Sequence, residues 1–172
     1  MPANTRIKDL RVAVTGGTSG LGLALVRLLT GRGARVAFVA RTASAVEFTT
    51  NRTGAFGIIG DVGRKSDIYP IALQIIGNLG GLDVLINNAS SLGPTPLAPL
   101  ADTECEELEQ ALAVNVLGPF RLTAAVGSNV WFPTLIGHQH ALWLMSEDDP
   151  KRSSRCAVNE VGWQATARAL PP

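Results

Sequence analysis

The sequence predicts an α/β fold with a doubly wound parallel sheet of about four strands, followed by an atypical C-terminal segment. Between residues 10 and 127, short apolar runs alternate with segments of helical periodicity. This alternation is typical of βαβ units, whose helices cover both faces of a parallel sheet. The first run leads directly into a glycine-rich turn, and the 172 residues suffice for one well-buried core.

Four short apolar runs are the expected strands. Their β-branched residues are typical of strands buried on both faces. The runs are residues 10–15, 35–40, 55–60 and 82–87.

Helical segments separate these runs. Residues 21–30 carry leucines at helical spacing, and residues 42–53 predict a shorter helix. Residues 68–79 predict a third helix, with Ser66 or Asp67 as its N-cap.

A loop and a long helix complete this part of the chain. Residues 90–100 hold three prolines and a glycine, which predicts a loop. Asp102 is the expected cap of a long helix that continues to Ala125, and the glutamates after it suit the positive end of the helix dipole.

Residues 127–172 differ in composition from the rest. They hold all three tryptophans and both histidines, and their periodicity is weak except in residues 141–145. That run predicts a strand ending at Ser146, about where a fifth strand and its serine would fall. We expect one domain over residues 1–126 and an atypical segment over 127–172 that is not an independent domain. The histidines and cysteines lack the number and spacing of ligands, so no metal site is expected.

Composition excludes several classes of protein. The net charge of +1 lacks the excess of a nucleic-acid binder, and no apolar run reaches membrane-spanning length. Residues 1–10 contain no apolar leader, and Cys105 and Cys156 cannot form a disulfide framework. We therefore expect a cytoplasmic protein that binds neither nucleic acid nor membrane.

The glycine-rich turn predicts a dinucleotide site. Gly16, Gly20 and Gly22 lie between an expected strand and an expected helix. Glycines at this spacing let the backbone approach a pyrophosphate, and the helix start supplies free N–H groups. A position between a strand and a helix is the context that a dinucleotide-binding motif requires.

The end of the second strand bears on the choice of cofactor. NAD sites usually place an acidic residue there, whereas a guanidinium suits the 2′-phosphate of NADP. Arg41 stands at this position, and the Thr42 hydroxyl can add a donor. NADP is therefore favoured over NAD, with a solvated arginine at a strand end as the alternative.

Two further strand ends carry polar motifs. The Asp61 carboxylate, followed by Val62, can accept a hydrogen bond from the adenine amino group. Residues 87–90, Asn-Asn-Ala-Ser, follow the fourth strand at the topological switch point where ligands bind. Asp and Asn often only form turns, but here polar motifs follow four successive strands.

These motifs, together with Asn115, resemble the short-chain dehydrogenase/reductase family in order and spacing over residues 8–126. The resemblance implies a Rossmann-like sheet and an oxidoreductase that transfers hydride between NAD(P)(H) and a carbonyl or secondary alcohol. A homo-oligomer is compatible with it. By position, the resemblance assigns the pyrophosphate and ribose to Gly16, Thr18, Ser19, Gly20, Leu21 and Gly22, the 2′-phosphate to Arg41 and Thr42, the adenine to Asp61 and Val62, the nicotinamide-side ribose to Asn88, Ala89 and Ser90, the underside of the cofactor to Val114, and a proton-relay water to Asn115.

The general acid that the resemblance implies is missing. The family protonates the alkoxide with a tyrosine, followed four residues later by a lysine, and orients the carbonyl with a serine. The one tyrosine here is Tyr69, in the expected third helix, with Leu73 four residues on. Ser146 is the remaining candidate for the serine.

Three hypotheses therefore stay open. The chain is an NADP-dependent oxidoreductase acting on a small carbonyl or alcohol, a nucleotide-binding module without chemistry, or a truncated or frame-shifted reductase product. The change in composition near residue 127 motivates the third.

Overall fold

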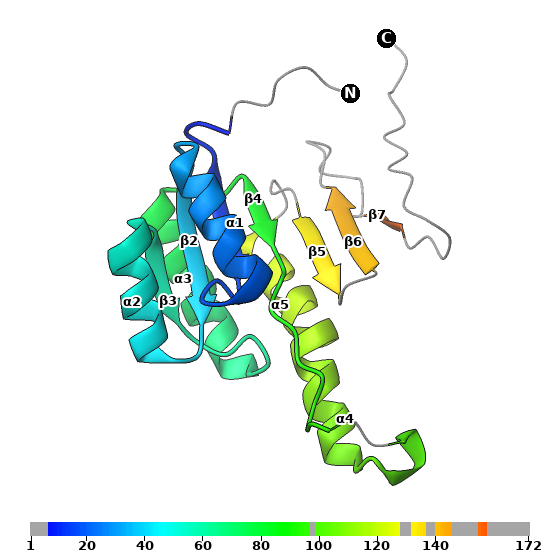
Figure 1. Ribbon diagram of the computed structural model, residues 1–172. Coiled ribbons are helices and arrows are strands. Elements are labelled where there is room, and N and C mark those ends of the chain that lie inside the picture. Colours follow the sequence, from blue (N-terminus) through cyan, green and yellow to red (C-terminus); the bar gives the residue numbers. More distant parts are fainter. Residues whose placement is uncertain (1–6, 97–98, 128–131, 137–139, 146–154, 158–172) are drawn as a thin grey trace.

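The computed structural model describes residues 7–96, 99–127, 132–136, 140–145 and 155–157. Its main sheet is parallel and four-stranded, in the order β3-β2-β1-β4 (Figure 1). Each strand lies inside one of the predicted apolar runs. The strands are β1 (Arg11–Thr15), β2 (Arg35–Ala40), β3 (Phe56–Ile59) and β4 (Val84–Ile86).

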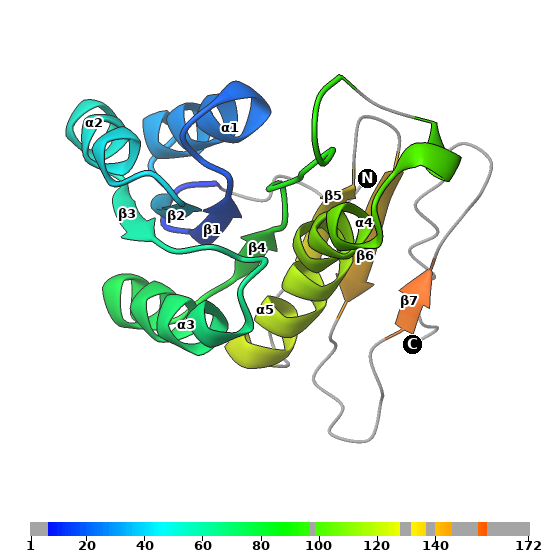
Figure 2. The ribbon, with the colours of Figure 1, turned by 90° about the horizontal axis from the view of Figure 1, so that it is seen from below.

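Helices cover both faces of this sheet, which confirms the doubly wound α/β fold. Figure 2 shows α1 (Gly20–Gly31) and α2 (Ala43–Thr53) on one face, with α3 (Lys65–Leu79) and α5 (Gly118–Val126) on the other. Two apolar cores result, one beneath each helical layer. Phe38 fills the α1 and α2 side, and Ile75 fills the α3 side; both are fully buried.

The predicted cap of the third helix is wrong. The helix α3 begins at Lys65, with Arg64 as its N-cap residue, rather than after Ser66 or Asp67. The Asp67 carboxylate lies in the first turn instead, where it accepts a hydrogen bond from the backbone N–H of Asp61. A carboxylate near a helix start can serve a donor outside the helix, and sequence position alone does not show which donor it meets.

The long helix also starts later than predicted. Asp102 ends a short 3₁₀ turn, η1 (Leu100–Asp102), and α4 (Cys105–Leu112) begins after Glu104. The helix then widens into a π-helical segment, η2 (Ala113–Leu117), before α5. Pro119 follows this segment and has no N–H to donate to the carbonyl four residues back, which favours the wider turn.

A second sheet follows α5. It is antiparallel, in the order β5-β6-β7, and β5 lies next to β4. Its strands are β5 (Phe132–Ile136), β6 (His140–Met145) and β7 (Arg155–Ala157). The strand predicted at residues 141–145 is therefore present, but as the middle of an antiparallel sheet and not as a fifth parallel strand. None of the described helices is both long and apolar enough to cross a membrane.

Candidate dinucleotide-binding site

A cleft of about 610 Å³ opens where the four parallel strands end. Every residue that the sequence assigned to cofactor contacts lines it. These residues are Gly16, Thr18, Ser19, Gly20, Leu21, Gly22, Arg41, Thr42, Asp61, Val62, Asn88, Ala89, Ser90 and Val114. The topology brings them together because parallel strands place all their carboxyl ends at one edge of the sheet.

The glycine-rich turn forms one wall of the cleft. Gly16 and Gly20 have positive φ angles of 72° and 50°, which other residues adopt only with strain. Ser19 is the N-cap residue of α1, and no side chain among the described residues caps this helix start. The first N–H groups of α1 therefore remain available to an anion in the cleft.

Hydrogen bonds tie this turn to the end of β4. The Thr15 hydroxyl oxygen accepts hydrogen bonds from the backbone N–H groups of Asn88 and Ala89, both at 3.0 Å. The Asn88 side-chain amide donates to the Thr15 carbonyl at 2.9 Å. Gly22 packs onto this junction, because a Cβ there would overlap the Gly16 carbonyl oxygen. The ends of the neighbouring strands β1 and β4 are thus joined into one surface.

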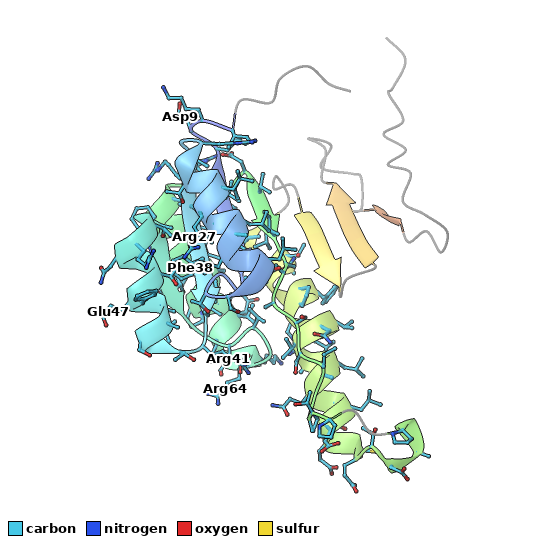
Figure 3. All side chains as sticks on the ribbon, in the orientation of Figure 1. Asp9, Arg27, Phe38, Arg41, Glu47 and Arg64 are labelled. Carbon is cyan, nitrogen blue, oxygen red and sulfur yellow. The ribbon has the colours of Figure 1, made fainter. Side chains whose placement is uncertain are left out.

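The ends of β2 and β3 form the opposite wall. The side chain of Arg41 is exposed, and Thr42 is the N-cap residue of α2. Figure 3 shows Arg41 and Arg64 at the end of the domain where these strands finish, and Asp9 at the other end. Oδ1 of Asp61 accepts a hydrogen bond from the N–H of Gly63 at 2.9 Å. A guanidinium and a carboxylate therefore border the same part of the cleft.

The π-helical segment closes the third side. Asn115 lies in η2 and forms a pair of hydrogen bonds with the backbone of Ser91. Its Oδ1 accepts from the Ser91 N–H at 2.8 Å, and its Nδ2 donates to the Ser91 carbonyl at 2.7 Å. Neighbouring Val114 lines the cleft and packs against Gly63, where a Cβ would lie 2.8 Å from Val114 Cγ2.

The catalytic candidates from the sequence are Asn115, described above, and Ser146, whereas the one tyrosine was not expected to act as the general acid. Tyr69 is on α3, with 71% of its side chain exposed, and it does not line the cleft formed by the described residues. Ser146 lies outside the described residues. Within the described part of the chain, no group of three or more His, Cys, Asp or Glu residues could hold a metal ion.

Sequence reasoning missed five lining residues, which extend the predicted motifs by one or two positions. They are Val39, Ala40, Gly60, Ser91 and Leu92. The strand-end position of the first three was the available signal, since ligands meet the last residues of parallel strands as well as the turns that follow.

A sequence model of the family described as short chain dehydrogenase matches residues 11–131. The chain belongs to this family. The family resemblance and the Rossmann-like fold inferred from the sequence are thereby confirmed.

Curated relatives of this short-chain dehydrogenase chain are longer than it is. It is 33% identical over 123 residues to an L-fucose dehydrogenase of Mus musculus, covering 71% of this chain and 44% of that protein. It is 35% identical over 111 residues to a 2,5-dichloro-2,5-cyclohexadiene-1,4-diol dehydrogenase of Sphingobium indicum, covering 63% and 44%. The chain thus spans less than half the length of these relatives.

Solved structures of the family share the fold. A short-chain dehydrogenase from Burkholderia cenocepacia, in complex with NADP, matches with a TM-score of 0.64 and 27% identity, covering 70% of this chain and 51% of that one. A blue fluorescent protein from a metagenomic library, in complex with NADPH, matches with a TM-score of 0.61 and 31% identity, covering 69% and 50%.

Proposed function

We propose that this short-chain dehydrogenase chain binds NADP(H) along the cleft. The observation that carries the proposal is the convergence of the predicted contact residues, from four strand ends and the π-helical segment, on one cleft. The donor set fits the cofactor, since the uncapped start of α1 suits a pyrophosphate and the Arg41 guanidinium suits a 2′-phosphate. The Asp61 carboxylate suits the amino group of adenine. Two solved structures that share the fold, a short-chain dehydrogenase in complex with NADP and a blue fluorescent protein in complex with NADPH, support this preference.

The bound cofactor would supply the hydride of an oxidoreductase reaction. The residues of this chain bind and orient: the Asn115 side chain fixes the backbone of Ser91, which lines the cleft beside Ser90. Protonation of the product alkoxide needs a general acid, and this sequence has no tyrosine followed four residues later by a lysine. Loss of a general acid costs about 10²–10⁴ in rate. We therefore propose that the 172-residue chain binds the cofactor without efficient turnover.

Fluorescence titration with NADPH and NADH tests the cofactor preference. We expect tighter binding of NADPH, and Arg41→Gln should weaken NADPH binding by about 10- to 100-fold while leaving NADH binding unchanged, because a charge-assisted contact to phosphate is lost. Arg27→Gln is the matched control, since Arg27 is exposed on α1 and outside the cleft lining (Figure 3). Wild-type protein that binds NADH as tightly as NADPH would refute the role given to Arg41.

Turnover assays test the second part of the proposal. The panel should contain simple ketones with NADPH, and L-fucose and D-threitol with NADP, because curated relatives carry the names of dehydrogenases for these two compounds. We expect rates at least about 100-fold below those of an ordinary reductase. Rates within about tenfold of those of an ordinary reductase would contradict the inference that a general acid is missing. They would favour the hypothesis of an active oxidoreductase.

A further inference from the structure

Asp67 connects the start of α3 to the turn that follows β3. Its Oδ2 accepts a hydrogen bond from the backbone N–H of Asp61 at 3.1 Å. Its Oδ1 accepts a hydrogen bond from the Ser66 hydroxyl at 2.9 Å. Both oxygens therefore serve donors other than the free N–H groups inside α3, which the helix-cap role would have engaged.

The N–H held by Asp67 belongs to the residue whose carboxylate borders the cleft. The Asp61 carbonyl accepts from the N–H of Arg64 at 3.0 Å, and its Oδ1 accepts from the N–H of Gly63 at 2.9 Å. Oδ2 of Asp61 forms an ion pair with Nε of Arg64 at 3.9 Å, which is beyond hydrogen-bond distance. The backbone and one carboxylate oxygen are thus fixed, and the other oxygen can accept from a ligand.

A close backbone contact with α5 also holds this turn. A Cβ at Gly118 would lie 2.6 Å from the Val62 carbonyl oxygen, so α5 touches the turn directly. The Asp67 carboxylate adds a hydrogen bond to the same turn, at the backbone N–H of Asp61. The hydrogen bond from the Asp61 backbone, followed by that from Ser66, holds the pKa of the Asp67 carboxyl below its ordinary value. Asp67 is consequently ionised at neutral pH, where such hydrogen bonds are strongest.

We propose that Asp67 is a positioning residue for adenine recognition, which fixes Asp61 so that its second carboxylate oxygen, Oδ2, accepts a hydrogen bond from the adenine amino group. The inference rests on the proposed binding of NADP(H). It concerns recognition of the base alone. Hypoxanthine serves as a comparison, because it carries a carbonyl oxygen where adenine carries the amino group. With hypoxanthine in the site, this carbonyl oxygen and the Asp61 carboxylate oxygen would face each other, and both are acceptors. A fixed carboxylate therefore favours adenine over hypoxanthine.

Paired titrations with NADPH and its reduced hypoxanthine analogue measure this selection. In the wild-type protein we expect a clear preference for NADPH. Asp67→Ala should reduce that preference about fivefold and change affinity for the analogue by less than about twofold, because only the adenine contact depends on the lost hydrogen bond. Asp67→Asn keeps one acceptor oxygen, so its preference for NADPH should lie between those of the wild-type protein and Asp67→Ala. Asp102→Ala, an exposed carboxylate in η1 outside the cleft lining, should behave as the wild type.

The outcomes separate this inference from the function on which it rests. Wild-type protein that binds neither probe refutes both. Wild-type protein that prefers NADPH, with Asp67→Ala retaining the full preference or losing affinity for both probes equally, refutes the role of Asp67 alone. Amide hydrogen exchange without cofactor gives a second measurement. Exchange at the Asp61 N–H should quicken in Asp67→Ala relative to Asp102→Ala, and an unchanged rate overturns the inference.

Discussion

Substitution of Gly22 by alanine tests whether the junction between the ends of β1 and β4 is as tightly packed as the structure shows. The new Cβ would overlap the Gly16 carbonyl oxygen and lie 2.5 Å from Nδ2 of Asn88. Ordinary carbon contacts are about 3.5–4.0 Å, so the Asn88 amide must move by about 1 Å. That movement breaks its hydrogen bond to the Thr15 carbonyl, now 2.9 Å long.

The size of the effect follows from three contributions. Overpacking costs about 1–3 kcal/mol, and the lost hydrogen bond about 1 kcal/mol. Alanine gains about 1 kcal/mol over glycine inside a helix. We expect Gly22→Ala to lower the free energy of unfolding by about 2 kcal/mol and to weaken NADPH binding at least about tenfold, because the displaced Gly16 and Asn88 line the cleft.

Urea unfolding followed by circular dichroism measures the stability change, and Gly77→Ala is the matched control. Gly77 lies inside α3, and no heavy atom of the described residues comes within 4 Å of a Cβ built there, outside its own helix and immediate neighbours. This second variant should gain about 0.5–1 kcal/mol from helix propensity alone. A Gly22→Ala protein as stable as the wild type, or one that binds NADPH equally well, would refute the packing argument.

Two further substitutions test other contacts. The hydrogen bond from the Arg11 side chain is the main cause that lowers the pKa of Asp83, so this pair stabilises the fold above the ordinary carboxyl pKa of about 3.9 and loses that contribution as the pH falls through the lowered value. Asp83→Asn should cost about 1 kcal/mol at pH 7 and flatten the acid side of the stability profile; an unchanged profile would contradict this. Asn115→Ala frees the backbone of Ser91 and should cost about 1–2 kcal/mol in urea unfolding. It should also weaken NADPH binding without affecting 2′,5′-ADP, which lacks the nicotinamide half, whereas equal losses would place Asn115 outside that half of the cleft.

The sequence predicted those parts of the fold whose signals are local. The composition of residues 35–40 alone predicts a buried strand. The glycines Gly16 and Gly20 predict a turn, and both have positive φ angles in the structure. The cleft followed from topology, because parallel strands place Arg41 and Asp61 at one edge. The composition of each run and the common edge at which parallel strands end were sufficient for these predictions.

The errors arose where the partner of a group lies outside its own element. Ser66 or Asp67 was expected to cap α3, but the N-cap residue is Arg64, and the Asp67 carboxylate accepts a hydrogen bond from the Asp61 N–H in the preceding turn. The apolar pattern passes through the π-helical segment around Asn115 without a break, so only Pro119 hints at the wider turn. The run at residues 141–145 predicts a strand, but its composition fits a parallel and an antiparallel neighbour equally well. It therefore does not indicate which strands it pairs with.

The cleft is formed by four separate strand ends, so the binding of a ligand in it is coupled to the folding of the chain. Thr15 and Asn88 are 73 residues apart in the chain, yet their contact exists only once β1 and β4 are assembled. An unfolded chain offers no such surface, so any ligand of the cleft shifts the equilibrium toward the folded state by mass action. A dinucleotide present at 100 times its dissociation constant would add about 2.7 kcal/mol to the free energy of unfolding. Under the proposed binding of NADP(H), the folded fraction of this chain in a cell would therefore rise and fall with the supply of that dinucleotide.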